Sequence, residues 1–148
     1  MLYTVGEMAK RLGIAPSTLR YYDQEGLLPF VERSSSGMPM FKDSDYEWLQ
    51  VIECLKKTGM QLKDIREFIE MAMQGDETIG PRLALIRQQR ELVKEQIKSL
   101  QDTLHTLDFK CWYYETAQSA GTTEIPRNMT LEELPEEFRD VRLKLRGE

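Results

Sequence analysis

The feature that most constrains the fold is an apolar stripe that repeats every seven residues through the second half of the chain. Two series with this spacing interleave by three and four residues: Leu83, Arg90, Ile97, Leu104 and Cys111, and Ile86, Val93, Leu100 and Leu107. Such interleaving is typical of the core positions of a coiled coil. One helix cannot bury this stripe by itself, so we expect a single long helix from Pro81 to about Ser119 that packs against a partner chain. Arg90 interrupts the apolar pattern, and it either fixes the register, pairs across the interface or extends past it.

The N-terminal region has the pattern of two short helices joined by a tight turn. Thr4 and Glu7 have the spacing of a capping box at the start of the first helix, and Gly13 suits its left-handed end. Pro16 suits the first position of the second helix, which we expect to run to about Glu25. Small, basic and aromatic side chains crowd the start of that second helix. A helix-turn-helix inserts this end into a DNA groove.

The next segment predicts a small β-hairpin followed by two more helices. Residues 30–33 and 38–41 have the pattern of short strands, and Ser34–Gly37 between them has the composition of a hairpin loop. Helices are expected from about Ser44 to Thr58 and from about Leu62 to Met73. A helix-turn-helix followed directly by a hairpin is a winged helix.

In this order and at these distances, the motifs resemble the MerR family of transcription regulators, and the pattern is most similar to its small members that respond to aldehydes and other electrophiles. The matching segments are Tyr3–Glu7, Thr18–Tyr22, Gly26–Leu28 and Gly59, and the resemblance covers residues 2 to about 112. It implies an all-α fold with a small β-hairpin wing: a winged helix-turn-helix head and a long coiled-coil helix that lies antiparallel to its mate in a homodimer.

We therefore expect four parts along the chain. They are a DNA-binding domain over residues 1–75, a linker over 76–80, the dimerisation helix over 81–119 and a C-terminal tail with a short amphipathic helix over 120–148. The expected dimerisation contacts are the apolar members of the two heptad series.

Seven residues are candidates for contact with double-stranded DNA: Ser17, Thr18, Arg20, Tyr21, Tyr22, Arg33 and Lys56. The planar donors of Arg20 suit guanine edges or phosphates, and Ser17 and Thr18 lie near a helix start, where an anion is favoured. Tyr21 and Tyr22 are adjacent on a helix, so one packs while the other reaches the DNA backbone. Lys56 matches a family position near the operator centre. The alternative for each is an ordinary surface residue.

Two departures from the family pattern predict a weaker or different grip by the wing. Pro39 stands where an arginine is expected, and Ala15 stands where a capping hydroxyl is common. The formal net charge is −5, and residues 1–46 hold five Lys or Arg against six acidic residues. Phosphate neutralisation supplies most nonspecific DNA affinity. We therefore expect weak nonspecific binding and reliance on a palindromic, shape-matched operator.

The resemblance also implies a mechanism. In the family, the operator lies between promoter elements that are separated by too long a spacer. Effector binding twists and bends this DNA, so that RNA polymerase engages both elements. Specificity would then rest in part on the cost of DNA deformation at bases that are not touched.

The effector is less defined by the sequence. Metal sensors of the family carry paired cysteines after the coil, whereas here Cys111 stands alone and His105 is the only histidine, so no metal and no cofactor are expected. Cys54 matches a cysteine of the aldehyde-responsive members, and Lys57 would favour its thiolate. It is therefore either a thiol sensor or a small buried residue. Cys111 is expected to pack in the coil.

The tail offers a second place for an effector. Four aromatic residues lie within Asp108–Glu115 at the end of the coil. From Pro135 onward, Phe138, Val141 and Leu145 recur at helical spacing and predict an amphipathic helix that folds back onto the aromatic cluster or onto the partner's head. The result is either a pocket for a small apolar or aromatic ligand or a plain hydrophobic cap.

Other classes of protein fit less well. No segment has the length and apolar character of a membrane span, no signal peptide is visible, and two lone cysteines do not form a disulfide framework, so the cytoplasm is expected. No nucleophile–base pair or phosphate loop predicts an enzyme. A coiled-coil adaptor that binds protein, and a ligand-independent repressor, remain alternatives.

Overall fold

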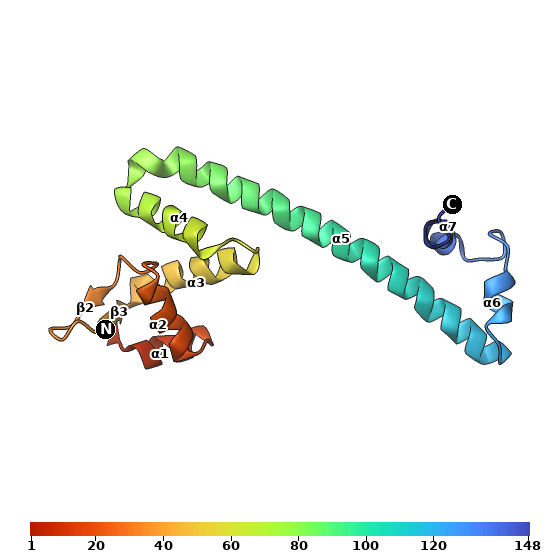
Figure 1. Cartoon of the computed structure of the whole chain (residues 1–148), viewed down its shortest axis with the longest axis horizontal. Helices are drawn as coiled ribbons and strands as arrows, with labels where there is room; N and C mark the ends of the chain where they lie inside the picture. The colour runs from red at the N-terminus through yellow and green to blue at the C-terminus, as the bar shows by residue number, and fades with distance from the viewer. The chain divides into compact units, whose positions relative to one another are not determined.

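The computed structural model describes all residues, 1–148, and the chain divides into two compact units, Met1–Val93 and Lys94–Glu148 (Figure 1). The first contains β1 (Leu2–Tyr3), α1 (Val5–Leu12), α2 (Pro16–Gln24), β2 (Glu32–Arg33), β3 (Pro39–Lys42), α3 (Asp43–Lys57), α4 (Leu62–Gln74) and η1 (Asp76–Thr78). Helix α5 (Ile79–Ala120) begins in the first unit and continues into the second. The second ends with α6 (Glu124–Asn128), η2 (Glu136–Phe138) and α7 (Arg139–Leu145). None of the helices combines the length and the apolar character needed to cross a membrane.

The helix-turn-helix forms where the sequence predicts it, because its signals are local. The Thr4 hydroxyl accepts a hydrogen bond from the Glu7 N–H at 3.3 Å, and the Glu7 carboxylate accepts one from the Thr4 N–H at 2.8 Å. Gly13 ends α1 with a φ of 72°, a left-handed conformation that glycine adopts without a steric penalty. Pro16 is the first residue of α2. Both helix ends that flank the turn are thus set by neighbouring residues.

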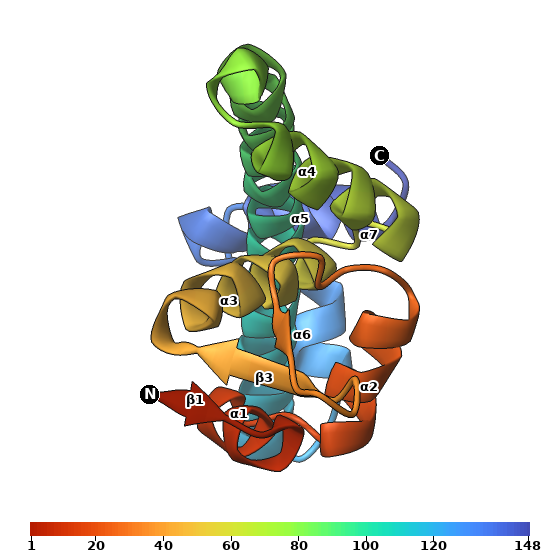
Figure 2. The same ribbon diagram turned by 90° about the vertical axis from the view of Figure 1, so that its left-hand side faces the viewer.

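The wing is a three-stranded antiparallel sheet in the order β1-β3-β2, one strand more than the predicted hairpin. Leu2 pairs with Lys42, and Glu32 pairs with Met40. Strand β1 has only two residues, which are too few for an alternation of apolar and polar residues to predict a strand. Figure 2 shows this sheet beside α1.

The core of the first unit joins the wing to all four of its short helices. Its buried apolar side chains include Met8, Leu19, Leu27, Phe41, Leu49, Ile52, Ile65 and Ile69. Helices α3 and α4 begin and end within one residue of their predicted bounds. Helix α1 contacts both α2 and α3, and Tyr22 of α2 is hydrogen-bonded to Glu53 of α3, so the two helices that carry candidate DNA contacts are held in one arrangement.

Helix α5 carries the heptad stripe, and most of that stripe is exposed on the single chain. Leu100 is 69% exposed, and Leu83, Ile86, Ile97, Leu104, Leu107 and Cys111 are also exposed, while Val93 is half-buried. The expected linker over 76–80 is instead a 3₁₀ turn that leads directly into α5. Exposed leucines at coiled-coil spacing leave an apolar surface that a second helix would cover.

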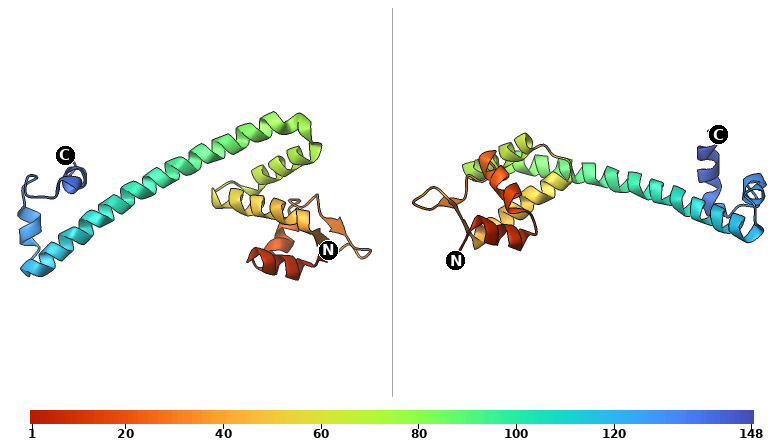
Figure 3. Two further views of the ribbon diagram at one scale, coloured as in Figure 1. Left: turned by 180° about the vertical axis from the view of Figure 1, so that it is seen from behind. Right: turned by 60° about the horizontal axis from the view of Figure 1, so that its bottom comes forward.

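In the second unit, the tail folds back onto the end of α5, as the amphipathic pattern predicts (Figure 3). Phe109 of α5 packs with Leu134, Phe138 and Val141, all less than 10% exposed, and Trp112 flanks this small core. The tail therefore covers the aromatic cluster of its own chain.

The tail contains a capping box that does not start a helix. Thr130 and Glu133 exchange the two hydrogen bonds of a capping box, at 2.9 and 3.4 Å, yet a turn follows instead of a helix. Pro135 disfavours helical conformation at the residue before it, so the helix begins only at Arg139, after a 3₁₀ turn.

Candidate nucleic-acid interface

The start of α2 presents an unpaired backbone donor together with hydroxyl side chains. Ala15 caps the helix without a side-chain hydrogen bond, and Pro16 has no N–H. The Thr18 N–H bonds to the Ala15 carbonyl at 3.0 Å, whereas no backbone carbonyl accepts from Ser17. No acidic residue lies in the first turn. The free N–H and the helix dipole together favour an anion such as a DNA phosphate here.

Arg20 and Tyr21 extend this surface along the helix. Arg20 is exposed and makes no ion pair within the chain, and Tyr21 is 48% exposed. Ser17 lies three and four residues before them, so the three side chains share one face of α2. A free guanidinium beside a phenol and a hydroxyl provides donors for base edges and phosphates.

Tyr22 points the other way, and its ring is only 1% exposed. Its hydroxyl donates to the Glu53 carboxylate at 2.6 Å and accepts from Lys56 Nζ at 2.9 Å. Burial, and then the bond to Glu53, raise the pKa of the Tyr22 phenol, which keeps it protonated. The buried ring cannot meet bases, so any DNA contact by Tyr22 is limited to its hydroxyl. Lys56 is itself exposed and is held by this hydroxyl.

Arg33 of the wing is tied to α2 rather than free. Both of its terminal nitrogens donate to the Asp23 carboxylate, and one also donates to the Gly37 carbonyl at 3.3 Å. The hydrogen bonds that Arg33 donates to Asp23 are the main cause of the raised pKa of Arg33. This pair partly neutralises the cation that was expected to grip phosphate. Sequence reasoning missed the role of Asp23, because the pairing depends on how the wing packs.

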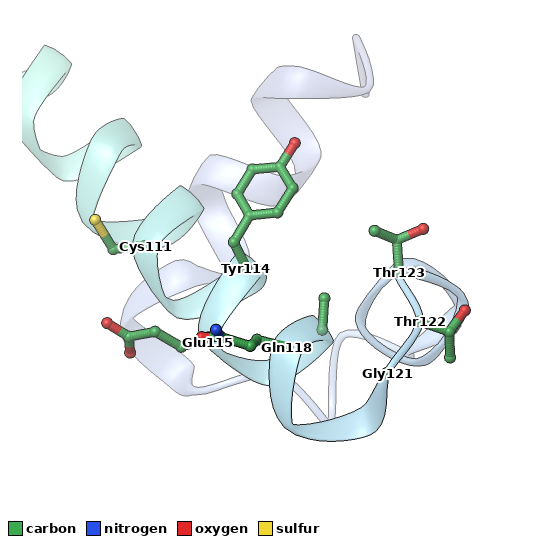
Figure 4. Close-up of a pocket in the computed structure, with 8 residues that line it drawn as sticks. Cys111, Tyr114, Glu115, Gln118, Gly121, Thr122 and Thr123 are labelled. Atoms are coloured by element: carbon green, nitrogen blue, oxygen red, sulfur yellow. The ribbon is translucent and has the colours of Figure 1, made fainter.

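The two cysteines are both exposed on the chain. Cys54 lies near the end of α3, so its alternative role as a buried packing residue does not hold for the single chain. Cys111 lines an open cavity of about 700 Å³ with Tyr114 and Gln118 of α5 and with Thr122 in the turn that follows (Figure 4). No three His, Cys, Asp or Glu side chains are grouped to hold a metal ion.

Residues 3–72 match the family described as "MerR HTH family regulatory protein", and residues 46–108 match the family described as "MerR, DNA binding". A Haemophilus influenzae relative, described as an uncharacterized HTH-type transcriptional regulator, is 43% identical over 136 residues that cover 92% of this chain and 98% of the relative.

Solved structures agree with the sequence matches. The crystal structure of HiNmlR, described as a MerR family regulator lacking the sensor domain and bound to promoter DNA, is 44% identical with a TM-score of 0.76 and matches 84% of this chain and 99% of its own. A MerR family regulator from Bacillus thuringiensis is 39% identical with a TM-score of 0.70, over 75% of this chain and 97% of its own.

Proposed function

This chain belongs to the MerR family of helix-turn-helix regulators, and we propose that it acts as a homodimer that distorts a palindromic operator within a promoter in response to an effector. It is a DNA-binding transcriptional regulator, and the family consists of regulators rather than enzymes. The observation that carries the proposal is the start of α2, where a free backbone donor, Ser17 and the unpaired Arg20 share one surface. The similar HiNmlR, which is bound to promoter DNA, supports it.

The exposed heptad stripe of α5 supports dimerisation. A second copy of the same helix, running antiparallel, would cover Leu100 and its neighbours. Two heads joined in this way would present two α2 helices to major grooves about 34–36 Å apart, or a multiple of that distance. RNA polymerase would then respond to the bent DNA rather than bind this chain through a dedicated surface. Such a regulator acts where the chromosome is, in the cytoplasm.

The candidate contacts divide by the part of DNA they would meet. Arg20 and Tyr21 suit the groove, while Ser17 and Thr18 suit a phosphate at the helix start. Lys56, with the Tyr22 hydroxyl beside it, suits the backbone near the operator centre. Arg33 would contribute fully only after release from Asp23.

Footprinting upstream of the chain's own gene tests the proposal. Protection of a palindrome between promoter elements is expected. Arg20→Ala should weaken binding by about 1–3 kcal/mol and relax the base preference at one position of each half-site. Arg20→Lys should retain more of the nonspecific affinity than of the specific affinity. Lys63→Ala, an exposed change on α4, is the control that should leave binding intact. Equal affinity of Arg20→Ala for the palindrome would overturn the assignment of α2 as the recognition helix.

For the effector, we propose an electrophile that reacts with Cys54. The thiol is exposed near the end of α3, where a reagent can reach it. Transcription in vitro should rise when a reactive aldehyde is added, and Cys54→Ser should abolish the rise, while Cys111→Ser should leave it intact. An unchanged response in Cys54→Ser would refute the thiol sensor. If adding the protein only lowers transcription, and does so equally with and without aldehyde, the chain is instead a ligand-independent repressor.

A further inference from the structure

A cavity of about 260 Å³ in the second unit is lined by positive charge and carries no acidic side chain. Its walls come from the end of α5, from α6 and from α7. The lining consists of four cations, two aromatic rings and one leucine: Lys110, Arg127, Arg142, Arg146, Phe109, Tyr113 and Leu145. Four cations around one small cavity, in a chain whose net charge is −5, are not explained by general composition.

Arg142 is the most unusual of the four, because it is only 4% exposed and has no carboxylate partner. Its guanidinium donates to the carbonyls of Pro126 at 2.8 Å and Met129 at 3.3 Å, and lies 5.5 Å from the centre of the Phe109 ring. Burying a charge without an opposite charge is costly. Burial, and then the nearby Arg146, lower the pKa of Arg142.

The other three cations are likewise held by neutral groups. Arg146 donates to the Arg127 carbonyl at 2.8 Å, and Arg127 donates to the Thr123 hydroxyl at 2.8 Å. Lys110 Nζ lies 4.7 Å from the centre of the Tyr113 ring and makes no ion pair. Asp140, the acid within α7, is instead hydrogen-bonded to His105 at 3.4 Å. The cations are therefore oriented but not neutralised.

We propose that this cavity binds a small organic anion, an aromatic carboxylate, with its acid group among Arg142, Arg146 and Lys110 and its ring against Phe109 and Tyr113. Guanidinium groups pair with carboxylates through two parallel hydrogen bonds, and aromatic walls suit a flat apolar body. The volume lies just below the range of about 300–1,000 Å³ that holds drug-sized ligands, so the ligand is about one ring in size.

Such a ligand would join the dimerisation helix to the tail. It would connect Lys110 of α5 with Arg142 of α7 and with Arg146, which follows α7, and so tighten the cap at the end of the helix that we expect to dimerise. The idea that this cavity is a second effector site rests on the proposed function as a regulator. The binding of the anion to the cavity does not depend on that function.

Fluorescence titration of the full chain tests the binding. Trp112 packs against Phe109 and Phe138, next to the cavity, and Trp48→Phe removes the other tryptophan, so that Trp112 alone reports. Benzoate is the probe, benzamide is its neutral match in shape, and inorganic phosphate is an anion without a ring. Benzoate should shift the Trp112 emission and bind more weakly as salt rises, and benzamide should bind at least about tenfold more weakly.

Two variants and one matched control locate the site. Lys110→Gln and Arg146→Gln should each weaken benzoate binding by about tenfold. Arg142 is left intact, because its hydrogen bonds hold the tail. Lys144→Gln removes the same charge from α7 at an exposed residue that lines a different cavity, and should change nothing. A thermal melt of each variant verifies that the fold is retained.

The outcomes separate this inference from the proposed function. Equal binding of benzoate and benzamide, or benzoate affinity unchanged in both variants, would overturn the anion site. Phosphate binding as tightly as benzoate would overturn the aromatic class of ligand. No response of Trp112 to any probe would overturn both. Benzoate binding that meets every expectation, by a protein that protects no palindrome, would support the cavity and refute the regulator proposal.

Discussion

Lys56 is held by Tyr22: the lysine ammonium donates to the phenol oxygen at 2.9 Å and also lies 5.1 Å from the centre of its ring. The same phenol donates to Glu53, one turn before Lys56 on α3. A residue of the proposed recognition helix thereby sets the position of a cation that we expect at the operator backbone. The two kinds of contact are coupled through one hydroxyl.

Tyr22→Phe tests this coupling. Removing the hydroxyl leaves the half-buried Glu53 without its donor, so the free energy of unfolding should fall by about 1–2 kcal/mol in urea denaturation. DNA affinity should also fall, because Lys56 loses its anchor. Tyr21→Phe is the control for stability, since the Tyr21 hydroxyl makes no hydrogen bond within the chain and its loss should not alter unfolding. Equal stability of Tyr22→Phe and wild type would contradict a stabilising role for the hydrogen bonds of the Tyr22 hydroxyl with Glu53 and Lys56.

Because Asp23 holds Arg33 in an ion pair, replacing Asp23 with an uncharged residue should increase the affinity for DNA. Asp23→Asn frees the Arg33 guanidinium and removes a negative charge beside α2, so binding should tighten by about three- to tenfold. The slope of log affinity against log salt should steepen by about one. Fluorescence anisotropy of labelled operator at several salt concentrations measures both.

A double-mutant cycle with Arg33→Gln serves as the control for this pair. If Asp23 acts through Arg33, part of the gain from Asp23→Asn should disappear in the Arg33→Gln background. A fully additive pair of effects would show that Asp23 acts only through long-range repulsion of phosphate.

Leu100→Glu should separate the dimer without unfolding the chain. Leu100 is 69% exposed in the single chain, so a charge at this position destabilises the monomer little. In the proposed coil, each copy would bury its introduced glutamate, which is unfavourable. The dimer should dissociate about 100-fold more readily in analytical ultracentrifugation. Ser99→Glu adds the same charge at the neighbouring position outside both heptad series, and should leave the dimer intact. Dissociation by both variants alike would indicate a different interface.

The sequence predicted those features whose causes are local. The capping box of Thr4 and Glu7, the left-handed Gly13 and the bounds of α3 and α4 follow from residues within a few positions of one another. The tail's return to the aromatic cluster followed from helical spacing after Pro135, although Pro135 itself delays the helix.

The remainder depends on residues that only the folded chain brings together. Tyr22 and Lys56 are 34 positions apart, and strand β1 exists only because Leu2 meets Lys42. The cations of the small cavity come from α5, α6 and α7, and α6 is only five residues long with Pro126 inside it. No spacing rule connects such positions, so pattern analysis alone does not find them.

The surface cluster around Asp43 predicts a dependence of stability on pH. A hydrogen bond from the Tyr3 hydroxyl at 2.9 Å, and then one from Arg11 at 3.0 Å, lower the pKa of Asp43 below its ordinary value. A group whose pKa is lower in the folded state stabilises the fold above its unfolded pKa of about 3.9 and loses this effect as pH falls through the folded value. The same hydrogen bond from Tyr3 to Asp43 raises the pKa of Tyr3, so that contribution is lost as pH rises through the folded pKa of the phenol, above about 10.

Asp43→Asn should therefore destabilise the chain by a small, constant amount between about pH 5 and 9. This difference from wild type should begin to shrink as pH falls below the unfolded pKa of about 3.9, and should vanish only below the lower folded pKa of Asp43. Urea midpoints measured across pH 3–8 check the acid limb. Asp64→Asn on α4 is the matched control, because the Asp64 side chain makes no comparable pair of hydrogen bonds and its substitution should not reproduce the profile. The difference in urea midpoint between wild type and Asp43→Asn could instead stay unchanged down to pH 3. That result would show that the charge of Asp43 does not link β1 to the rest of the head.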